Sequence, residues 1–254
     1  MLATNETAAD AIAALSNMQA EFVSAGAVVT RQNILSTAGA VTPATFTASP
    51  GPYDVVLIGT VYAAMDSSNW TAVQTAMSVR AANSFVMFVD GCCQLAANLE
   101  GMRTVLNNAS NFGLTTGLTF NQHDSFPLNT NSPYQGSFSG LTPFAGGYYT
   151  LLNNVPAANA LYLPAGTVTP PALGTTTPAY GLFVPVSQSF AGAGACLFAV
   201  NDISPWYGSP YVTNLGKIAP AFLAAAGSGG ACGLPASVSK AFTPTSVAAG
   251  ESVT

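Results

Sequence analysis

Short apolar segments alternate with amphipathic segments along the first 113 residues of the chain. Residues 54–60 and 85–89 form apolar runs that are typical of strands buried on both faces. The segments 7–26, 69–83 and 95–113 instead carry apolar side chains three or four positions apart, which predicts amphipathic helices. Because strands alternate with helices through short loops, we expect a mostly parallel sheet sandwiched by helices, a three-layer α/β fold.

The pattern changes after residue 113. Eight of the seventeen prolines fall within 114–180, where the helical periodicity is lost, and we expect an irregular, β-rich flap there. Apolar strands return at 181–186 and 195–200, and a last helix is expected at 209–227. Three further short strands are expected: 27–35 before the flap, and 146–152 and 159–163 within it.

The four apolar strands are expected to lie in one sheet and to run in the same direction. Right-handed crossovers would then bring their carboxyl ends to one edge, where the sites of such sheets form. Glu6 and the residues at 62–66 and 90–93 follow strands or precede helices at that edge. We therefore expect the functional site, if the domain has one, to lie at this edge.

Composition narrows the classes of partner. Charged residues make up 6% of the chain and hydrophobic residues 49%, so the surface must consist largely of small and uncharged polar residues. The five lysines and arginines are scattered singly, and we expect no nucleic-acid partner. The mean hydropathy is +0.39, but no run of about 18 apolar residues exists, so we expect no membrane insertion. Such a surface is typical of secreted and cell-surface bacterial proteins.

The four cysteines are Cys92, Cys93, Cys196 and Cys232, and they permit two disulfides in three connectivities. Neighbouring cysteines rarely bond each other, because the ring strains the peptide between them. If bridges exist, we expect one of the adjacent pair to reach Cys196 or Cys232. Buried free thiols are the alternative, and the absence of CxxC spacing argues against zinc.

Four segments resemble a known fold: YDVVLIGT at 53–60, FVMFVDGCCQ at 85–94, SPYQGSFSGLTPFAGGYY at 132–149, and GACLFAVNDISPWYGSPYVTNLGKIAPAFL at 194–223. Together they resemble the class I glutamine amidotransferase-like proteins, especially the trehalose-utilisation-like branch. The resemblance implies a flavodoxin-like, three-layer domain over residues 1–230.

Both ends of the sequence suggest a piece of a longer protein. The fold of the resemblance begins with a strand before the first helix, and only MLAT at 1–4 remains of it. No signal peptide is visible at the N-terminus, which is expected of a cytosolic protein or of a chain that begins after processing. At the C-terminus, AFTPTSVAAGESVT resembles the start of an immunoglobulin-like repeat of bacterial surface proteins. We therefore expect residues 231–254 to be a linker and the beginning of a C-terminal β-repeat.

Amidotransferases of this fold use a cysteine on a tight turn after a strand, activated by a histidine beyond the last strand. The resemblance places Cys93 on that turn, although Leu95 replaces the second glycine of the family motif. No histidine follows the last strand, and the single histidine is His123, within the flap. If the protein is an enzyme, we expect a Cys93–His123 pair with Asp202 or Asp124 as the orienting carboxylate.

Carboxylates and aromatic rings are the other candidates. Asp66, Asp90 and Asp202 follow apolar strands, so their oxygen atoms could converge and bind Ca²⁺ or Mg²⁺, or they could cap the helices and turns that follow. Six aromatic residues could line a sugar-binding surface or pack a loop against the core: Phe144, Tyr148, Tyr149, Trp206, Tyr207 and Tyr211.

These observations favour a non-catalytic binding or assembly domain of a secreted or surface-attached bacterial protein. Its expected partners are other protein domains or surface glycans, and association with further copies of the same chain is the alternative. The missing histidine after the last strand makes an enzyme the less favoured class. The alternatives are a hydrolase or amidotransferase that uses Cys93, and a structural subunit of an extracellular fibre or coat.

Overall fold

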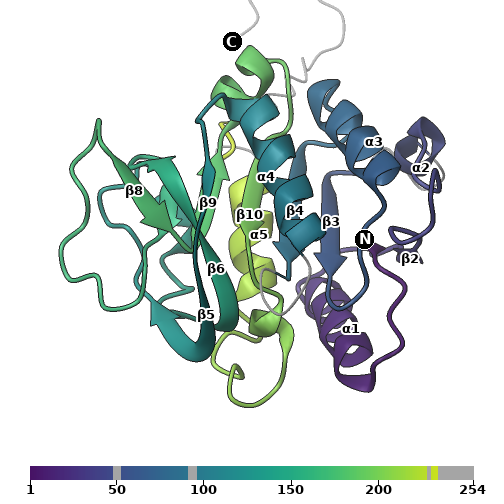
Figure 1. The fold of residues 1–254 in the computed structure, drawn as a ribbon, viewed down its shortest axis with the longest axis horizontal. Coiled ribbons are helices and arrows are strands. Elements are labelled where there is room, and N and C mark those ends of the chain that lie inside the picture. The colour runs from purple at the N-terminus through teal and green to yellow at the C-terminus, as the bar shows by residue number, and fades with distance from the viewer. Residues whose placement is uncertain (48–52, 91–95, 228–229, 234–254) are drawn as a thin grey trace, which may run out of the picture.

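In a computed structural model, the chain is an α/β protein with a seven-stranded mixed sheet flanked by helices and a separate three-stranded antiparallel sheet (Figure 1). The structure describes residues 1–47, 53–90, 96–227 and 230–233. The helices are α1 (Ala9–Ser24), α2 (Pro43–Thr47), α3 (Ser67–Ser78), α4 (Ala96–Ser110) and α5 (Ile218–Ala226), with 3₁₀ turns η1 (Gln135–Phe138), η2 (Val186–Gly192) and η3 (Ser204–Trp206). The strands are β1 (Leu2–Ala3), β2 (Gln32–Asn33), β3 (Val55–Thr60), β4 (Ser84–Val89), β5 (Thr115–Phe126), β6 (Phe144–Pro156), β7 (Ala160–Tyr162), β8 (Thr176–Ala179), β9 (Gly181–Val184) and β10 (Cys196–Val200).

The large sheet has the strand order β2-β1-β3-β4-β10-β9-β7. Strands β2, β1, β3, β4 and β10 run parallel, which confirms the predicted α/β class. β9 pairs antiparallel with β10, so the expectation that all four apolar strands run the same way is wrong for this strand. The connection 185–195 is too short for a crossover, which normally takes a dozen or more residues.

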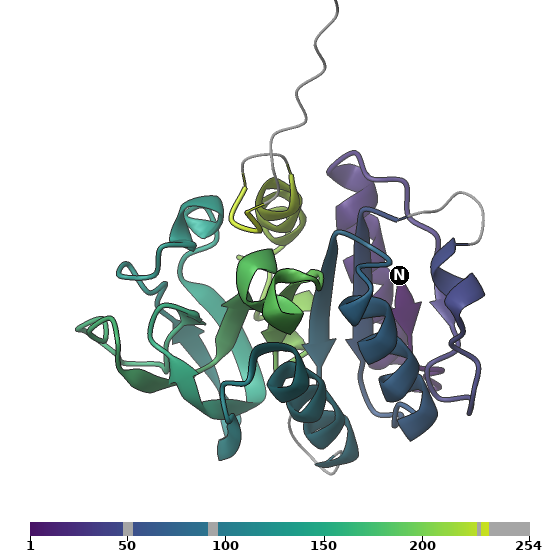
Figure 2. The ribbon, with the colours of Figure 1, turned by 90° about the horizontal axis from the view of Figure 1, so that it is seen from above.

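Helices cover both faces of the large sheet (Figure 2). α1 and α5 lie on one face, and α3 and α4 lie on the other. Side chains of β4 alternate between the two cores: Val86 and Phe88 pack toward α1 and α5, and Phe85 and Met87 pack toward α3 and α4. Burial on both faces explains why these strands appear as continuous apolar runs in the sequence.

The predicted flap is β-rich, as expected, but more regular than predicted. β5 and β6 form a long antiparallel pair that runs from Thr115 opposite Asn153 to Phe126 opposite Phe144. β8 adds to the other side of β6. β5 was not predicted, because most of its twelve residues are exposed or half-buried and lack an apolar alternation.

Two other expected elements are shorter in the structure. The strand predicted over 27–35 is reduced to Gln32–Asn33, which pairs with β1. The helix predicted over 209–227 begins only at Ile218. Turns occupy 209–217 instead, where Pro210 and a Gly216 at φ 81° oppose helix formation.

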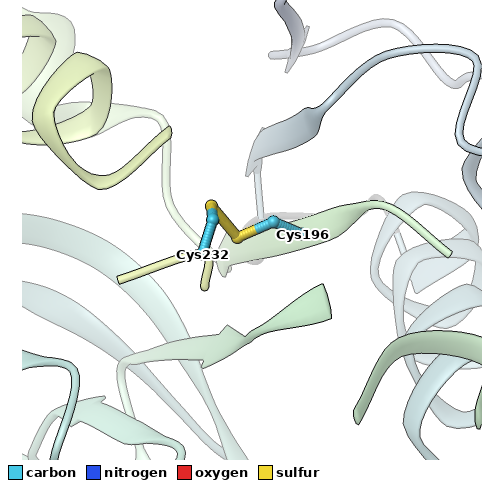
Figure 3. Close-up of a disulfide and its surroundings, with 2 residues drawn as sticks. All are labelled: Cys196 and Cys232. Atoms are coloured by element: carbon cyan, nitrogen blue, oxygen red, sulfur yellow. A yellow bond between two sulfur atoms is a disulfide. The ribbon is translucent and has the colours of Figure 1, made fainter. Parts of the chain in front are cut away.

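One disulfide joins Cys196 and Cys232, whose Cα atoms lie 5.4 Å apart (Figure 3). The bond ties the start of β10 to the loop that follows α5, and both cysteines are buried. The expectation that Cys92 or Cys93 would reach one of these two cysteines is therefore wrong. Cys92 and Cys93 lie outside the described residues.

Candidate functional site

A cleft of about 510 Å³ opens at the carboxyl edge of the parallel strands, where α1, the large sheet and the β5–β6 pair meet. This is the edge at which α/β sheets commonly hold ligands. We call it the tyrosine cleft, and six of its lining residues define it: Asp10, Tyr62, His123, Tyr148, Tyr207 and Tyr211.

Two other hollows have comparable volumes, about 490 and 590 Å³. The first lies at the opposite edge of the sheet and is lined largely by aliphatic side chains and the loop 25–30. The second lies between α3 and α4 and holds one aromatic residue, Trp70, which is buried. The tyrosine cleft combines more aromatic rings with hydrogen-bonding groups than either, which makes it the strongest candidate site.

The first wall of the cleft comes from α1 and the segments that follow β3 and β10. The Tyr62 hydroxyl donates to Asp10 Oδ2 at 2.7 Å, and the Tyr207 hydroxyl lies 3.5 Å from the Tyr62 hydroxyl. Glu6 fixes the turn that carries Tyr62, because its carboxylate accepts three successive backbone N–H groups after β3, at 3.1–3.2 Å. Glu6 and Tyr62 therefore meet at the edge where both were expected.

The second wall is built from His123, Tyr148 and Tyr211. His123 Nδ1 is hydrogen-bonded to the Tyr211 hydroxyl, and the imidazole lies edge-on to the rings of Tyr211 and Tyr148, with centroids 5.2 and 5.5 Å apart. Tyr148 has a φ of 59°, a left-handed conformation that bulky residues rarely adopt. It sits at a β-bulge, where it alone faces two residues of β5. Bulges redirect side chains, and here Tyr148 lines the cleft.

Two glycines of β6 allow these rings to approach the strand. A Cβ atom on Gly147 would collide with the Tyr211 hydroxyl and with His123 Nδ1, and one on Gly146 would collide with the Tyr180 hydroxyl and Asp202. Glycine within a strand often marks a close approach of this kind. The second wall therefore depends on the pair Gly146–Gly147.

Asp202 lies beneath the second wall. Its carboxylate accepts the Gly147 N–H at 2.8 Å, the Tyr180 hydroxyl at 3.0 Å and the Ser204 N–H at 2.6 Å. Burial raises the pKa of Asp202 to about 7, although hydrogen bonds from its partners oppose the shift. Asp202 therefore joins β6, the end of β10 and the turn into η3, and it acts as a positioning residue for the cleft.

The expected catalytic residues are only partly brought together. Cys93 lies outside the described residues, whereas His123 lines the cleft and is bonded to Tyr211. The hydrogen bonds of Asp202 described above go to β6, Tyr180 and Ser204, and those of Asp124 go to Tyr149 and Gln122. Neither carboxylate is placed by these bonds as the orienting partner of His123.

The three aspartates predicted to bind a cation have separate roles. Asp66 is half-buried and caps α3 by accepting the Ser68 N–H, at 2.9 Å. Asp90 is buried at the end of β4, and Asp202 is buried beneath the cleft. Within the described part of the chain, no three histidine, cysteine, aspartate or glutamate residues form a metal-binding group. The structure thus does not assemble Asp66, Asp90 and Asp202 into a calcium or magnesium site.

The six aromatic residues predicted near this edge divide into two sets. Tyr148, Tyr207 and Tyr211 line the cleft. Phe144, Tyr149 and Trp206 belong to the core on the α1–α5 side. Packing against the core was the second of the two roles expected for these aromatic residues.

Sequence reasoning did not assign Asp10 or Asn17 to the site. Both lie on α1, whose first turns reach the same edge as Tyr62, and Asn17 donates to the Trp206 carbonyl at 2.8 Å. Polar residues are ordinary on the outer face of an amphipathic helix, so nothing in the sequence distinguishes these two from other surface residues. The pair Gly146–Gly147 within an apolar strand was the available signal for the second wall.

No family model, no curated protein and no solved structure matches this chain. Among the described residues, no helix is long and apolar enough to span a bilayer.

Proposed function

We propose that the protein is a non-catalytic carbohydrate-binding domain of a secreted or surface-attached bacterial protein, with the tyrosine cleft as its binding site. One observation carries the proposal: four tyrosines from three separate segments of the fold line a single cleft. Tyr62 and Tyr148 are 49% and 40% exposed there, so part of each ring is accessible to a ligand.

The chemistry of the cleft suits a sugar. One face of a pyranose ring presents C–H groups, which pack on the faces of tyrosine rings, while tyrosine hydroxyls exchange hydrogen bonds with the sugar hydroxyls. Asp10 and His123 add further hydrogen-bonding atoms to the lining. A volume of about 510 Å³ falls in the range of small-molecule sites, about 300–1,000 Å³.

The disulfide supports the proposed location. Disulfides persist in oxidising compartments and are rare in the cytosol, and the Cys196–Cys232 bond is buried within the core. The low charge of the chain fits the same setting.

Tyr148→Ala is expected to weaken binding of an oligosaccharide about tenfold, because one aromatic contact contributes roughly 1.4 kcal/mol. A glycan array with the native protein would identify a ligand, and isothermal titration calorimetry would then compare the variants. Tyr53→Ala is the matched control, since Tyr53 is a half-buried tyrosine at the opposite edge of the sheet. If the native protein binds no glycan, or if both variants lose affinity equally, the proposal is wrong.

A cysteine hydrolase or amidotransferase is the second candidate. It is favoured by the position of His123, which lines a cleft at the edge where β4, the strand before Cys93, ends. Iodoacetamide labelling followed by mass spectrometry separates the two functions. An activated thiol would label rapidly at neutral pH, and His123→Ala would slow it. The binding proposal expects the slow rate of an ordinary thiol, unaffected by His123→Ala.

A further inference from the structure

The distribution of charge points to a more specific ligand. We propose that the tyrosine cleft binds an amino sugar with a free, positively charged amine, such as an oligomer of glucosamine without N-acetyl groups. This inference rests on the proposed carbohydrate-binding function and adds to it the charge of the ligand and the residue that recognises it, Asp10.

The first argument is the sign of the charge in the cleft. Asp10 lies in the lining, and among the described residues no lysine or arginine lines it. Burial raises the pKa of Tyr207, and the negative charges of Asp10 and Asp90 raise it further. The Asp10 carboxylate therefore gives the first wall a negative charge, which would repel uronic acids and sulfated sugars.

The second argument is the geometry around Asp10. Its Oδ2 accepts the Tyr62 hydroxyl at 2.7 Å and its Oδ1 accepts the Ala11 N–H at 2.9 Å. Each carboxylate oxygen has two lone pairs, so both can accept a further hydrogen bond. Asp10 is exposed at the mouth of the cleft, where an ammonium group can reach it from solvent.

The third argument is the aromatic surround. The Tyr62 and Tyr207 hydroxyls lie next to Asp10 and to each other. An ammonium group near Asp10 can donate to the carboxylate and to a tyrosine hydroxyl, and it is attracted to the face of a ring within about 6 Å. His123, the ionisable base of the lining, stands on the opposite wall with Tyr211. We therefore place the amine on the wall of Asp10 and Tyr62, with the rest of the sugar ring toward Tyr148.

The test compares three probes of similar length by isothermal titration calorimetry at pH 6 and low salt: a glucosamine tetramer, an N-acetylglucosamine tetramer and a galacturonic acid tetramer. We expect the glucosamine tetramer to bind at least tenfold more tightly than the N-acetylated tetramer, and the acidic tetramer to bind most weakly. Because Asp10 is exposed, 0.5 M salt is expected to reduce the preference for the amine.

Asp10→Asn assigns the preference to one carboxylate. Asparagine keeps an oxygen that accepts from Tyr62, so the variant removes charge with little change of shape, and the preference for glucosamine is expected to fall below threefold. Asp54→Asn is the matched control, since Asp54 is an exposed carboxylate at the opposite edge of the sheet and its loss changes the net charge equally. That variant is expected to keep the full preference.

Each outcome has a distinct meaning. Equal affinity for the two glucosamine-based tetramers, or a preference for the acidic one, overturns this inference and leaves the carbohydrate-binding proposal standing. A preference that survives in Asp10→Asn overturns the assignment to Asp10. If none of the three tetramers binds and the glycan array is also empty, the proposed function fails, and the inference fails with it.

Discussion

Raising the pH from 4 to 8 is expected to lower the free energy of unfolding by about 4 kcal/mol through Asp202 alone. Burial raises the pKa of this carboxyl to about 7, from an ordinary value near 3.9. Between these two values the folded state binds the proton and the unfolded state does not. The contribution of Asp202 to stability is therefore complete below about pH 4 and is lost as the pH rises through about 7. Urea unfolding at a series of pH values measures it.

Asp202→Asn isolates this effect from other groups. Asparagine can still accept a hydrogen bond from the Gly147 N–H but does not titrate. The free energy of unfolding of the variant is therefore expected to lose the part of its pH dependence that comes from Asp202. The wild type and the variant must be compared because burial also raises the pKa of Glu21. The titration of Glu21 therefore also lowers the free energy of unfolding as the pH rises. Asp66→Asn is the control, because Asp66 caps α3 and asparagine caps a helix equally well. Parallel stability curves for the wild type and Asp202→Asn would show that the carboxyl does not titrate near pH 7.

The same bonds connect Asp202 to binding. Gly147, which donates to Asp202, lies next to Tyr148 and against Tyr211 and His123. Ionisation of Asp202 at high pH is therefore expected to weaken the packing of the second wall of the cleft. Glycan binding should be compared at the same pH for all variants for this reason.

The sequence predicted β3, β4 and β10 because these parallel strands are buried on both faces. The runs at 54–60 and 85–89 are apolar throughout, and the helices beside them show a clear three-to-four spacing. The direction of β9 was not predictable in this way, since burial is the same for a strand of either direction. Its reversal follows from the short connection 185–195, which joins neighbouring antiparallel strands but is too short for a crossover.

The site was less predictable, because its residues come together only through the packing of distant segments. The carboxyl edge and all four of its tyrosines, Tyr62, Tyr148, Tyr207 and Tyr211, could be named from the sequence. Asp10 could not, since an acidic residue in the first turn of a helix is ordinary there. The role of Asp202 also required the structure, because its burial and its bond to Gly147 join segments 55 residues apart.

Removing the Cys196–Cys232 bond is expected to lower the free energy of unfolding by about 4 kcal/mol. The bond closes a loop with a sequence separation of 36, and the loss of chain entropy in the unfolded state scales with the logarithm of that length. The double variant Cys196→Ala/Cys232→Ala should show this loss in guanidinium unfolding under non-reducing conditions. Alanine is the right replacement because both positions are buried and apolar.

The effect should spread from the bond to α5 and the core beneath it. The Cys232 N–H donates to the Ala225 carbonyl at the end of α5, and Phe222 of α5 packs on Phe88 and Phe198, with ring centroids 5.9 and 4.4 Å apart. Hydrogen exchange is therefore expected to increase in α5 more than in α3, which lies on the other face of the sheet. A double variant that unfolds at the wild-type guanidinium concentration would mean that the bond contributes nothing to stability. The argument for an oxidising compartment would then lose its structural basis, because a reducing environment would cost the fold little.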